Sequence, residues 1–112
     1  MPGPKPLCQL NDIEDNGSIG IIGDLESGRA SLIVVRQGEK VFVYLNTCPH
    51  IGAPLDFTPG QFLNVERDLI QCAMHGALFT IEDGRCVQGP CMGKHLTPVT
   101  SELRKGVVWL VV

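Results

Sequence analysis

Glycine and proline recur along this chain too often for long helices to form. The 13 glycines and eight prolines make up almost a fifth of its 112 residues, where ordinary usage is about 12%. Both residue types interrupt helices and mark turns, so the pattern favours short strands joined by turns. A chain of this length forms one domain. We therefore expect a single all-β domain spanning residues 1–112.

The clearest predicted element is a β-hairpin in the first half of the chain. The stretches 31–36 and 41–46 are rich in β-branched or aromatic residues and flank the turn sequence QGEK, the arrangement typical of a hairpin. Turns are also expected at Asn16-Gly17 and in EDGR at 82–85. The remaining strands are expected at 6–10, 19–25, 69–71, 78–81, 96–103 and 107–112.

The sequence VFVYLN, from residue 41 to 46, predicts a strand that is covered on both sides. Side chains alternate between the two faces of a strand. Val41, Val43 and Leu45 therefore share one face, while Phe42 and Tyr44 take the other. Apolar residues on both faces indicate that neither face is exposed to solvent.

The middle of the chain differs in amino-acid composition from its two ends. From Thr47 to about Met92 it has short apolar segments between turns, and prolines at 49, 54, 59 and 90. This composition predicts a β-rich base subdomain built from residues 1–46 and 93–112. A loop-rich subdomain, residues 47–92, is inserted into it.

The insertion carries two cysteine-histidine pairs, each after a predicted strand. Cys48 and His50 are separated by one residue, and Cys72 and His75 by two. Close spacing lets one short loop present both side chains to a single centre, so two such loops provide a four-ligand metal site. Buried cysteines that happen to lie near surface histidines would explain one pair but are a poor explanation of two.

The donor set alone leaves two metals open. Two thiolates and two imidazoles suit tetrahedral Zn²⁺, although zinc motifs more often place like residues together on each element. One cysteine and one histidine on each loop is the arrangement needed by a [2Fe–2S] cluster with two cysteines on one iron and two histidines on the other.

The flanking residues resemble those of Rieske-type ferredoxins, the small [2Fe–2S] proteins that supply electrons to ring-hydroxylating dioxygenases. The matching segments are CPHIGAPL, CAMHGALF and GRCVQGPC. The resemblance implies one [2Fe–2S] cluster per chain, with Cys48 and Cys72 on one iron and His50 and His75 on the other. It also implies a Rieske-like antiparallel β-sandwich or barrel base with an inserted cluster-binding subdomain, residues 47–92.

The same resemblance implies a low reduction potential. High-potential Rieske proteins have a disulfide between the two cluster loops, and a Ser and a Tyr that donate hydrogen bonds to the cluster. Ala53 and Met74 stand at the disulfide positions here, and Ala77 and Phe79 at the donor positions. Fewer hydrogen bonds stabilise the reduced cluster less, so we expect the low end of the roughly −150 to +300 mV range.

The function implied is one-electron transfer from a flavin-dependent ferredoxin reductase to a terminal Rieske oxygenase. Such a carrier is not an enzyme by itself and binds no small-molecule substrate. The formal charge of −3 gives no basic surface for nucleic acid. Without a signal peptide or a membrane-spanning segment, we expect a cytoplasmic protein. The alternatives are a Rieske-like small subunit of an assimilatory nitrite reductase and a zinc-stabilised binding module.

Five other residues could be mistaken for site residues. Cys86 and Cys91 could form a redox disulfide, but small apolar packing beside the cluster is the favoured interpretation. His95, next to a lysine, is expected at the solvated surface. Trp109 is expected in the core. Cys8, on a predicted edge strand, is expected to be inert.

Overall fold

The computed structural model of this protein describes residues 4–25, 28–47, 49, 55, 61–72 and 76–111. These residues form nine strands and one short 3-10 helix, η1 (Leu10–Asp12). The strands are β1 (Lys5–Gln9), β2 (Ser18–Leu25), β3 (Gly28–Gln37), β4 (Lys40–Leu45), β5 (Leu69–Gln71), β6 (Leu78–Thr80), β7 (Cys86–Gln88), β8 (Ser101–Arg104) and β9 (Val107–Leu110). The all-β prediction is confirmed. Within these described ranges, no helix has the length and apolar character required to cross a membrane.

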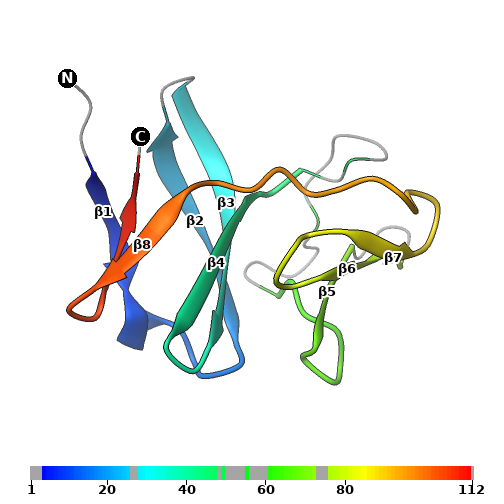
Figure 1. Ribbon diagram of the computed structural model, residues 1–112, viewed down its shortest axis with the longest axis horizontal. Coiled ribbons are helices and arrows are strands. Elements are labelled where there is room, and N and C mark those ends of the chain that lie inside the picture. Colours follow the sequence, from blue (N-terminus) through cyan, green and yellow to red (C-terminus); the bar gives the residue numbers. More distant parts are fainter. Residues whose placement is uncertain are drawn as a thin grey trace.

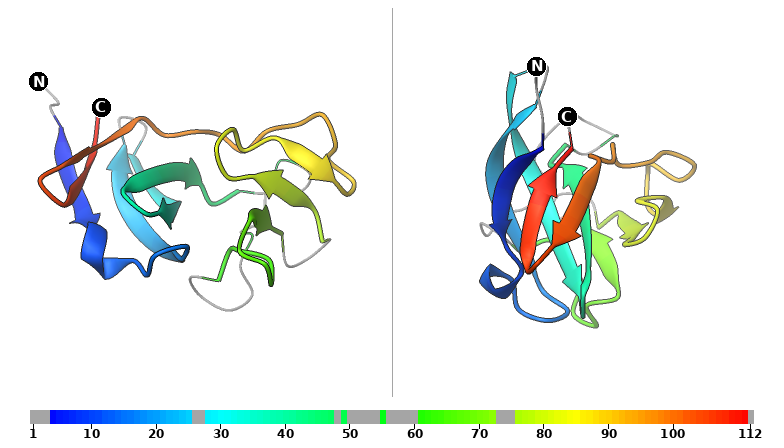
Figure 2. Two further views of the ribbon diagram at one scale, coloured as in Figure 1. Left: turned by 60° about the horizontal axis from the view of Figure 1, so that its bottom comes forward. Right: turned by 60° about the vertical axis from the view of Figure 1, so that its left-hand side comes forward.

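The strands form three antiparallel sheets of three strands each, in the orders β1-β9-β8, β2-β3-β4 and β5-β6-β7. Figure 1 shows the first sheet at one end of the molecule, the third sheet at the other end and the second sheet between them. The left view of Figure 2 shows the same order along the long axis.

The first sheet joins the two ends of the chain. β1 pairs with β9 and lies at the edge of the sheet, as predicted. The β8–β9 hairpin turns at Lys105 and Gly106, which both have positive φ (+50° and +75°), the geometry that matches the twist of paired strands. The prediction for Trp109 was wrong. Strand alternation buries its neighbours Val108 and Leu110 and leaves Trp109 only partly buried on the other face.

The second sheet contains the predicted hairpin. β3 and β4 pair from Leu32–Leu45 to Gln37–Lys40, across a turn at Gly38 and Glu39. β3 begins at Gly28, earlier than predicted, because its first residues pair with the end of β2. The centre of this sheet is fully buried: Leu32, Ile33, Val34 and Val35 have no exposed surface.

Opposite faces of this middle sheet contribute to two different hydrophobic cores, as the alternation in VFVYLN predicted. The base core packs the sheet against β1 and β9, and the insertion core packs it against residues from 55 to 96. The buried members of the base core are Ile13, Leu32, Val34, Val43, Val108 and Leu110. Those of the insertion core are Ile33, Val35, Tyr44, Leu55, Phe62, Ile70, Cys72, Ala77, Phe79, Ile81, Cys86, Cys91 and Leu96. The boundary at residues 47–92 stays a prediction, since the insertion core also includes β3 and β4.

The third sheet is small, and its strands have three residues each. β5 has the predicted bounds, and β6 ends one residue early, at Thr80. The predicted turn at 82–85 is present, with Gly84 at φ +67° and its N–H bonded to the carbonyl of Thr80 at 2.8 Å. A side chain at Gly84 would meet the ring of Tyr44 at 2.7 Å, so this turn packs directly on β4.

The prediction of a strand at 96–103 is correct only for its last residues, because β8 begins at Ser101. The preceding residues extend along β4 instead, with Leu45 N–H bonded to Thr97 C=O and Val99 N–H bonded to Val43 C=O, both at 2.9 Å. Pro98 lies between them and has no N–H to donate, so the pairing stays an isolated bridge. This segment returns the chain from the third sheet to the first.

Candidate metal centre

The structure describes one of the four predicted ligands. Cys72 lies directly after β5 and is completely buried. Cys48, His50 and His75 lie outside the described residues, as do Ala53 and Met74. Within the described ranges, no three potential ligands (His, Cys, Asp or Glu side chains) converge on one point. The ligand set therefore stays a prediction, and the described residues show how the two loops are anchored.

Two backbone hydrogen bonds join the two ends of the second cysteine-histidine loop. The N–H of Cys72 donates to the carbonyl of Ala77 at 2.8 Å, and the N–H of Gly76 donates to the carbonyl of Cys72 at 2.9 Å. Gly76 has φ +66°, a conformation that glycine adopts without steric cost. These bonds bring Gly76 and Ala77 back to Cys72, so the two ends of the second loop lie close together.

The first loop is anchored by a side chain that the sequence analysis overlooked. Asn46, only 7% exposed, follows β4. Its Oδ1 accepts a hydrogen bond from the N–H of Leu55 at 2.8 Å, and its Nδ2 donates to the hydroxyl of Ser31 at 3.2 Å. Asn46 therefore joins the two ends of the segment that contains Cys48 and His50. A polar residue that ends an apolar, two-sided strand was the signal that could have identified it.

A third loop packs against the second one. Gly89 has φ +107°, and a Cβ added to it would lie 2.8 Å from the Cα of Ala77. The backbone of the Gly89-Pro90 turn thus approaches the loop after Cys72 too closely for any side chain.

Two positions next to the second loop cannot donate hydrogen bonds from their side chains. Ala77 and Phe79 are both completely buried members of the insertion core. Their methyl and phenyl groups fill space where a Ser and a Tyr would present hydroxyls. The described part of the site is therefore apolar at both positions.

The remaining cysteines and histidine differ in environment. Cys86 and Cys91 are buried in the insertion core, and their Sγ atoms are 3.2 Å apart, while His95 is exposed as predicted. Cys8 is half-buried on β1; burial, and next the charge of Asp12, raises the pKa of its thiol to about 11. A thiol with such a pKa is almost fully protonated near neutral pH, which agrees with the expected inertness.

The donor chemistry fits an iron–sulfur cluster. The sequence supplies two thiols and two imidazoles, and Cys72 is shielded from water at the base of a tight loop. Soft sulfur ligands with imidazole are the set found in mixed-ligand [2Fe–2S] centres.

Comparisons with known proteins agree with this chemistry. Residues 4–105 match the family model of the Rieske [2Fe-2S] domain. The chain is 30% identical over 86 residues to the cholesterol 7-desaturase of Caenorhabditis elegans, covering 75% of this chain and 18% of that protein. It thus spans less than a fifth of that relative's length.

Three solved structures share the fold over nearly the whole chain. The ferredoxin of carbazole 1,9a-dioxygenase from Nocardioides aromaticivorans IC177 has a TM-score of 0.75 at 20% identity, covering 98% of both chains. A ferredoxin in complex with the oxygenase of carbazole 1,9a-dioxygenase has a TM-score of 0.73 at 24% identity, covering 96% of this chain and 92% of that one. A nitrite reductase (NADPH) small subunit has a TM-score of 0.70 at 15% identity, covering 97% and 98%.

The family match, the shared fold and the buried cysteine at the base of the second loop lead to one assignment. The chain belongs to the Rieske [2Fe-2S] domain family.

Proposed function

We propose that this protein is a one-electron carrier that holds one low-potential Rieske [2Fe–2S] cluster and passes electrons from a reductase to a terminal oxygenase. The observation that carries the proposal is the match over 98% of both chains to the ferredoxin of a dioxygenase. A domain that matches a ferredoxin over its full length has the size and shape of a carrier.

Cys48 and Cys72 would bind one iron of the cluster and His50 and His75 the other, with one cluster per chain. When bound, the cluster accepts and releases a single electron. The protein's part is to hold the ligands in place and exclude water. Asn46 closes the first loop, the Cys72–Ala77 hydrogen bond closes the second, and Gly89 packs against the second.

The expected potential lies within about 100 mV of −150 mV, at the low end of the Rieske range. Support comes from Ala77 and Phe79, whose buried apolar side chains offer no hydrogen bond to a neighbouring sulfur or ligand. Hydrogen bonds of that kind stabilise the added negative charge on reduction, so their absence lowers the potential.

The proposed partners are a flavin-dependent ferredoxin reductase and a terminal Rieske oxygenase, in the cytoplasm. The oxygenase is supported by the similar ferredoxin found in complex with an oxygenase. A formal charge of −3 is compatible with docking on basic surfaces of both partners, and association should then weaken as salt is raised.

The test begins with metal analysis of protein purified without a metal-binding tag. We expect two irons and two acid-labile sulfides per chain, and an EPR spectrum with a low average g-value after reduction with dithionite. One zinc per chain without sulfide would instead establish a zinc-stabilised module and refute the electron-transfer role.

A second candidate, the small subunit of a nitrite reductase, is favoured by the fold match that covers 97% of this chain. Co-purification with untagged partners distinguishes the two. A stable complex with a large sirohaem subunit would support the nitrite reductase. Reduction of the isolated protein by a flavin-dependent reductase, followed by oxidation by a Rieske oxygenase, would support the carrier.

A further inference from the structure

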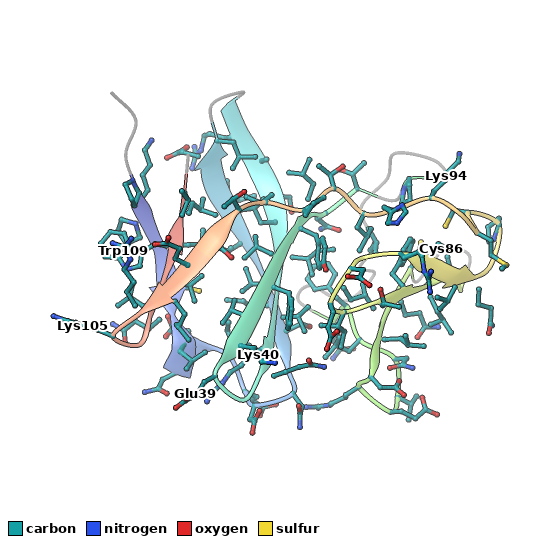
Figure 3. The ribbon with its side chains drawn as sticks, in the orientation of Figure 1. Glu39, Lys40, Cys86, Lys94, Lys105 and Trp109 are labelled. Atoms are coloured by element: carbon teal, nitrogen blue, oxygen red, sulfur yellow. The ribbon has the colours of Figure 1, made fainter. Side chains whose placement is uncertain are left out.

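Cys86 and Cys91 form a pair of buried thiols outside the predicted ligand set. Cys91 Sγ lies 3.2 Å from Cys86 Sγ, and the two side chains are 1% and 3% exposed. In Figure 3, Cys86 lies on β7 in the part of the molecule that contains the third sheet, far from Lys105 and Trp109.

Lys94 forms backbone hydrogen bonds with both cysteines. The N–H of Cys86 donates to the carbonyl of Lys94, and the N–H of Lys94 donates to the carbonyl of Cys91, both at 2.9 Å. The two thiols are therefore kept close by the folded backbone as well as by side-chain packing. A disulfide has an S–S distance of about 2.0 Å, so the sulfurs need to approach by only about 1 Å.

The pair lies directly beneath the surface. Every residue between the two cysteines, from Val87 to Pro90, is exposed, and so are Met92, Gly93 and Lys94. Gly89 and Gly93 have φ of +107° and +88°, so the covering segment contains two residues with wide backbone freedom. A small shift of this segment would admit an oxidant of about the size of water.

We propose that Cys86 and Cys91 are a modification site, at which a hydroperoxide forms an intramolecular disulfide. One thiolate sulfur attacks the peroxide, the O–O bond breaks, and the products are a sulfenic acid and, for hydrogen peroxide, water. The second thiol sulfur attacks the sulfenic sulfur, the S–O bond breaks and a second water leaves. Two electrons pass from the two thiols to one peroxide.

The modification would act next to the metal centre. The bridge would close a six-residue ring containing Gly89, which packs against Ala77 after the second loop. Oxidation would therefore restrict the segment that packs against Ala77. The inference does not require the proposed electron-transfer partners, and the chemistry of the thiol pair can be tested alone.

The positions of lysine and arginine make the test direct. Trypsin cleaves after Arg85 and Lys94 and releases residues 86–94, a peptide that contains both cysteines of the pair and no other. Cys48 falls in the peptide 41–67 and Cys72 in the peptide 68–85. The holoprotein is treated with one equivalent of hydrogen peroxide, denatured, alkylated with iodoacetamide, digested and analysed by mass spectrometry.

We expect peptide 86–94 from oxidised protein to carry no alkyl group and to be lighter by two hydrogen atoms than the dithiol form. Treatment with dithiothreitol before alkylation should restore two alkyl groups. The proposal is overturned if both thiols remain alkylated after oxidation. It is also overturned if they gain oxygen atoms separately, or if either cysteine pairs with a cysteine on another peptide.

Variants give an independent check. In Cys86→Ser or Cys91→Ser the 86–91 disulfide cannot form, so the remaining thiol should stay alkylatable or be oxidised to sulfinic acid without losing hydrogen. Cys8→Ser, a change outside the insertion, should form the 86–94 disulfide as the unmodified sequence does. The measurement on the unmodified sequence stands even if a pair variant fails to fold.

Discussion

The side-chain oxygen of Asn46 accepts a hydrogen bond from the backbone N–H of Leu55 at 2.8 Å. The two residues flank the segment that contains Cys48 and His50, so this bond links the two ends of the first cysteine-histidine loop. Both partners are buried, so the bond is shielded from competition by water and its loss leaves a buried N–H unsatisfied.

Asn46→Ala should lower the free energy of unfolding by about 1–3 kcal/mol, because it leaves the Leu55 N–H without an acceptor. It should also reduce the iron content of purified protein. Asn64→Ala is the matched control, since Asn64 also caps a turn but two of its three side-chain hydrogen bonds are exposed. Denaturant titration and iron analysis measure both effects. Equal losses of iron in the two variants would contradict a special role for Asn46.

Gly89→Ala tests the contact between the third loop and the second. The new Cβ would lie 2.8 Å from Ala77 Cα, in addition to the strain of φ +107°. Gly93→Ala is the control: its φ of +88° is also unfavourable, but nothing lies within 4 Å of a Cβ there. We expect Gly89→Ala to be less stable than Gly93→Ala by about 1–3 kcal/mol, the usual cost of overpacking. Denaturant titration measures the free energy of unfolding of both variants. Equal values would show that the backbone shifts at little cost to accommodate a Cβ beside Ala77.

Tyr44 should make stability depend on pH in alkaline solution. Its hydroxyl donates to the carbonyl of Ile81 at 2.5 Å. Burial, followed by the charges of Asp83 and Glu82, raises its pKa from 10.0 to about 12. The folded state therefore keeps a proton that the unfolded state releases from about pH 10. The contribution of the protonated Tyr44 hydroxyl to the free energy of unfolding is complete below pH 10 and is lost as the pH rises towards 12.

Denaturation midpoints measured between pH 9 and 12 should therefore fall with pH in the unmodified protein. Tyr44→Phe should remove the part of this slope that belongs to Tyr44, and should cost about 1–3 kcal/mol at neutral pH by leaving the Ile81 carbonyl without its donor. Tyr44 is the only tyrosine, so phenolate absorbance reports its ionisation directly. A native titration midpoint near 10 would refute the expected shift.

Cys72→Ser and Cys48→Ser should each abolish the cluster, and with it much of the order of the insertion, since a bound metal centre contributes directly to folding. Cys8→Ser should keep the full complement of iron and sulfide, because Cys8 lies on β1 in the base. Iron, sulfide and visible absorption measure the outcome. Full iron in either of the first two variants would show that the ligand assignment is wrong.

Much of the strand pattern is encoded locally. The alternation in VFVYLN predicted a strand between two apolar surroundings, and the structure places Val43 in one core and Tyr44 in the other. The turns at Asn16-Gly17 and 82–85 were also predictable, because few residues tolerate positive φ, and Asn16 and Gly84 adopt it at +58° and +67°. The predictions for Trp109 and for residues 96–100 were wrong where packing and an isolated bridge overrode local preference.

The sequence by itself determined the class of fold and the family and predicted a four-residue ligand set, because periodicity, turn chemistry and Cys-His spacing are short-range properties. Only the tertiary structure decided the contacts between segments distant along the chain: Asn46 with Leu55, Gly89 with Ala77, and Tyr44 with Ile81. It also decided that Cys86 and Cys91 touch within the core. Such contacts arise when the whole chain excludes water from two cores at once, and no local pattern specifies which side chains then meet.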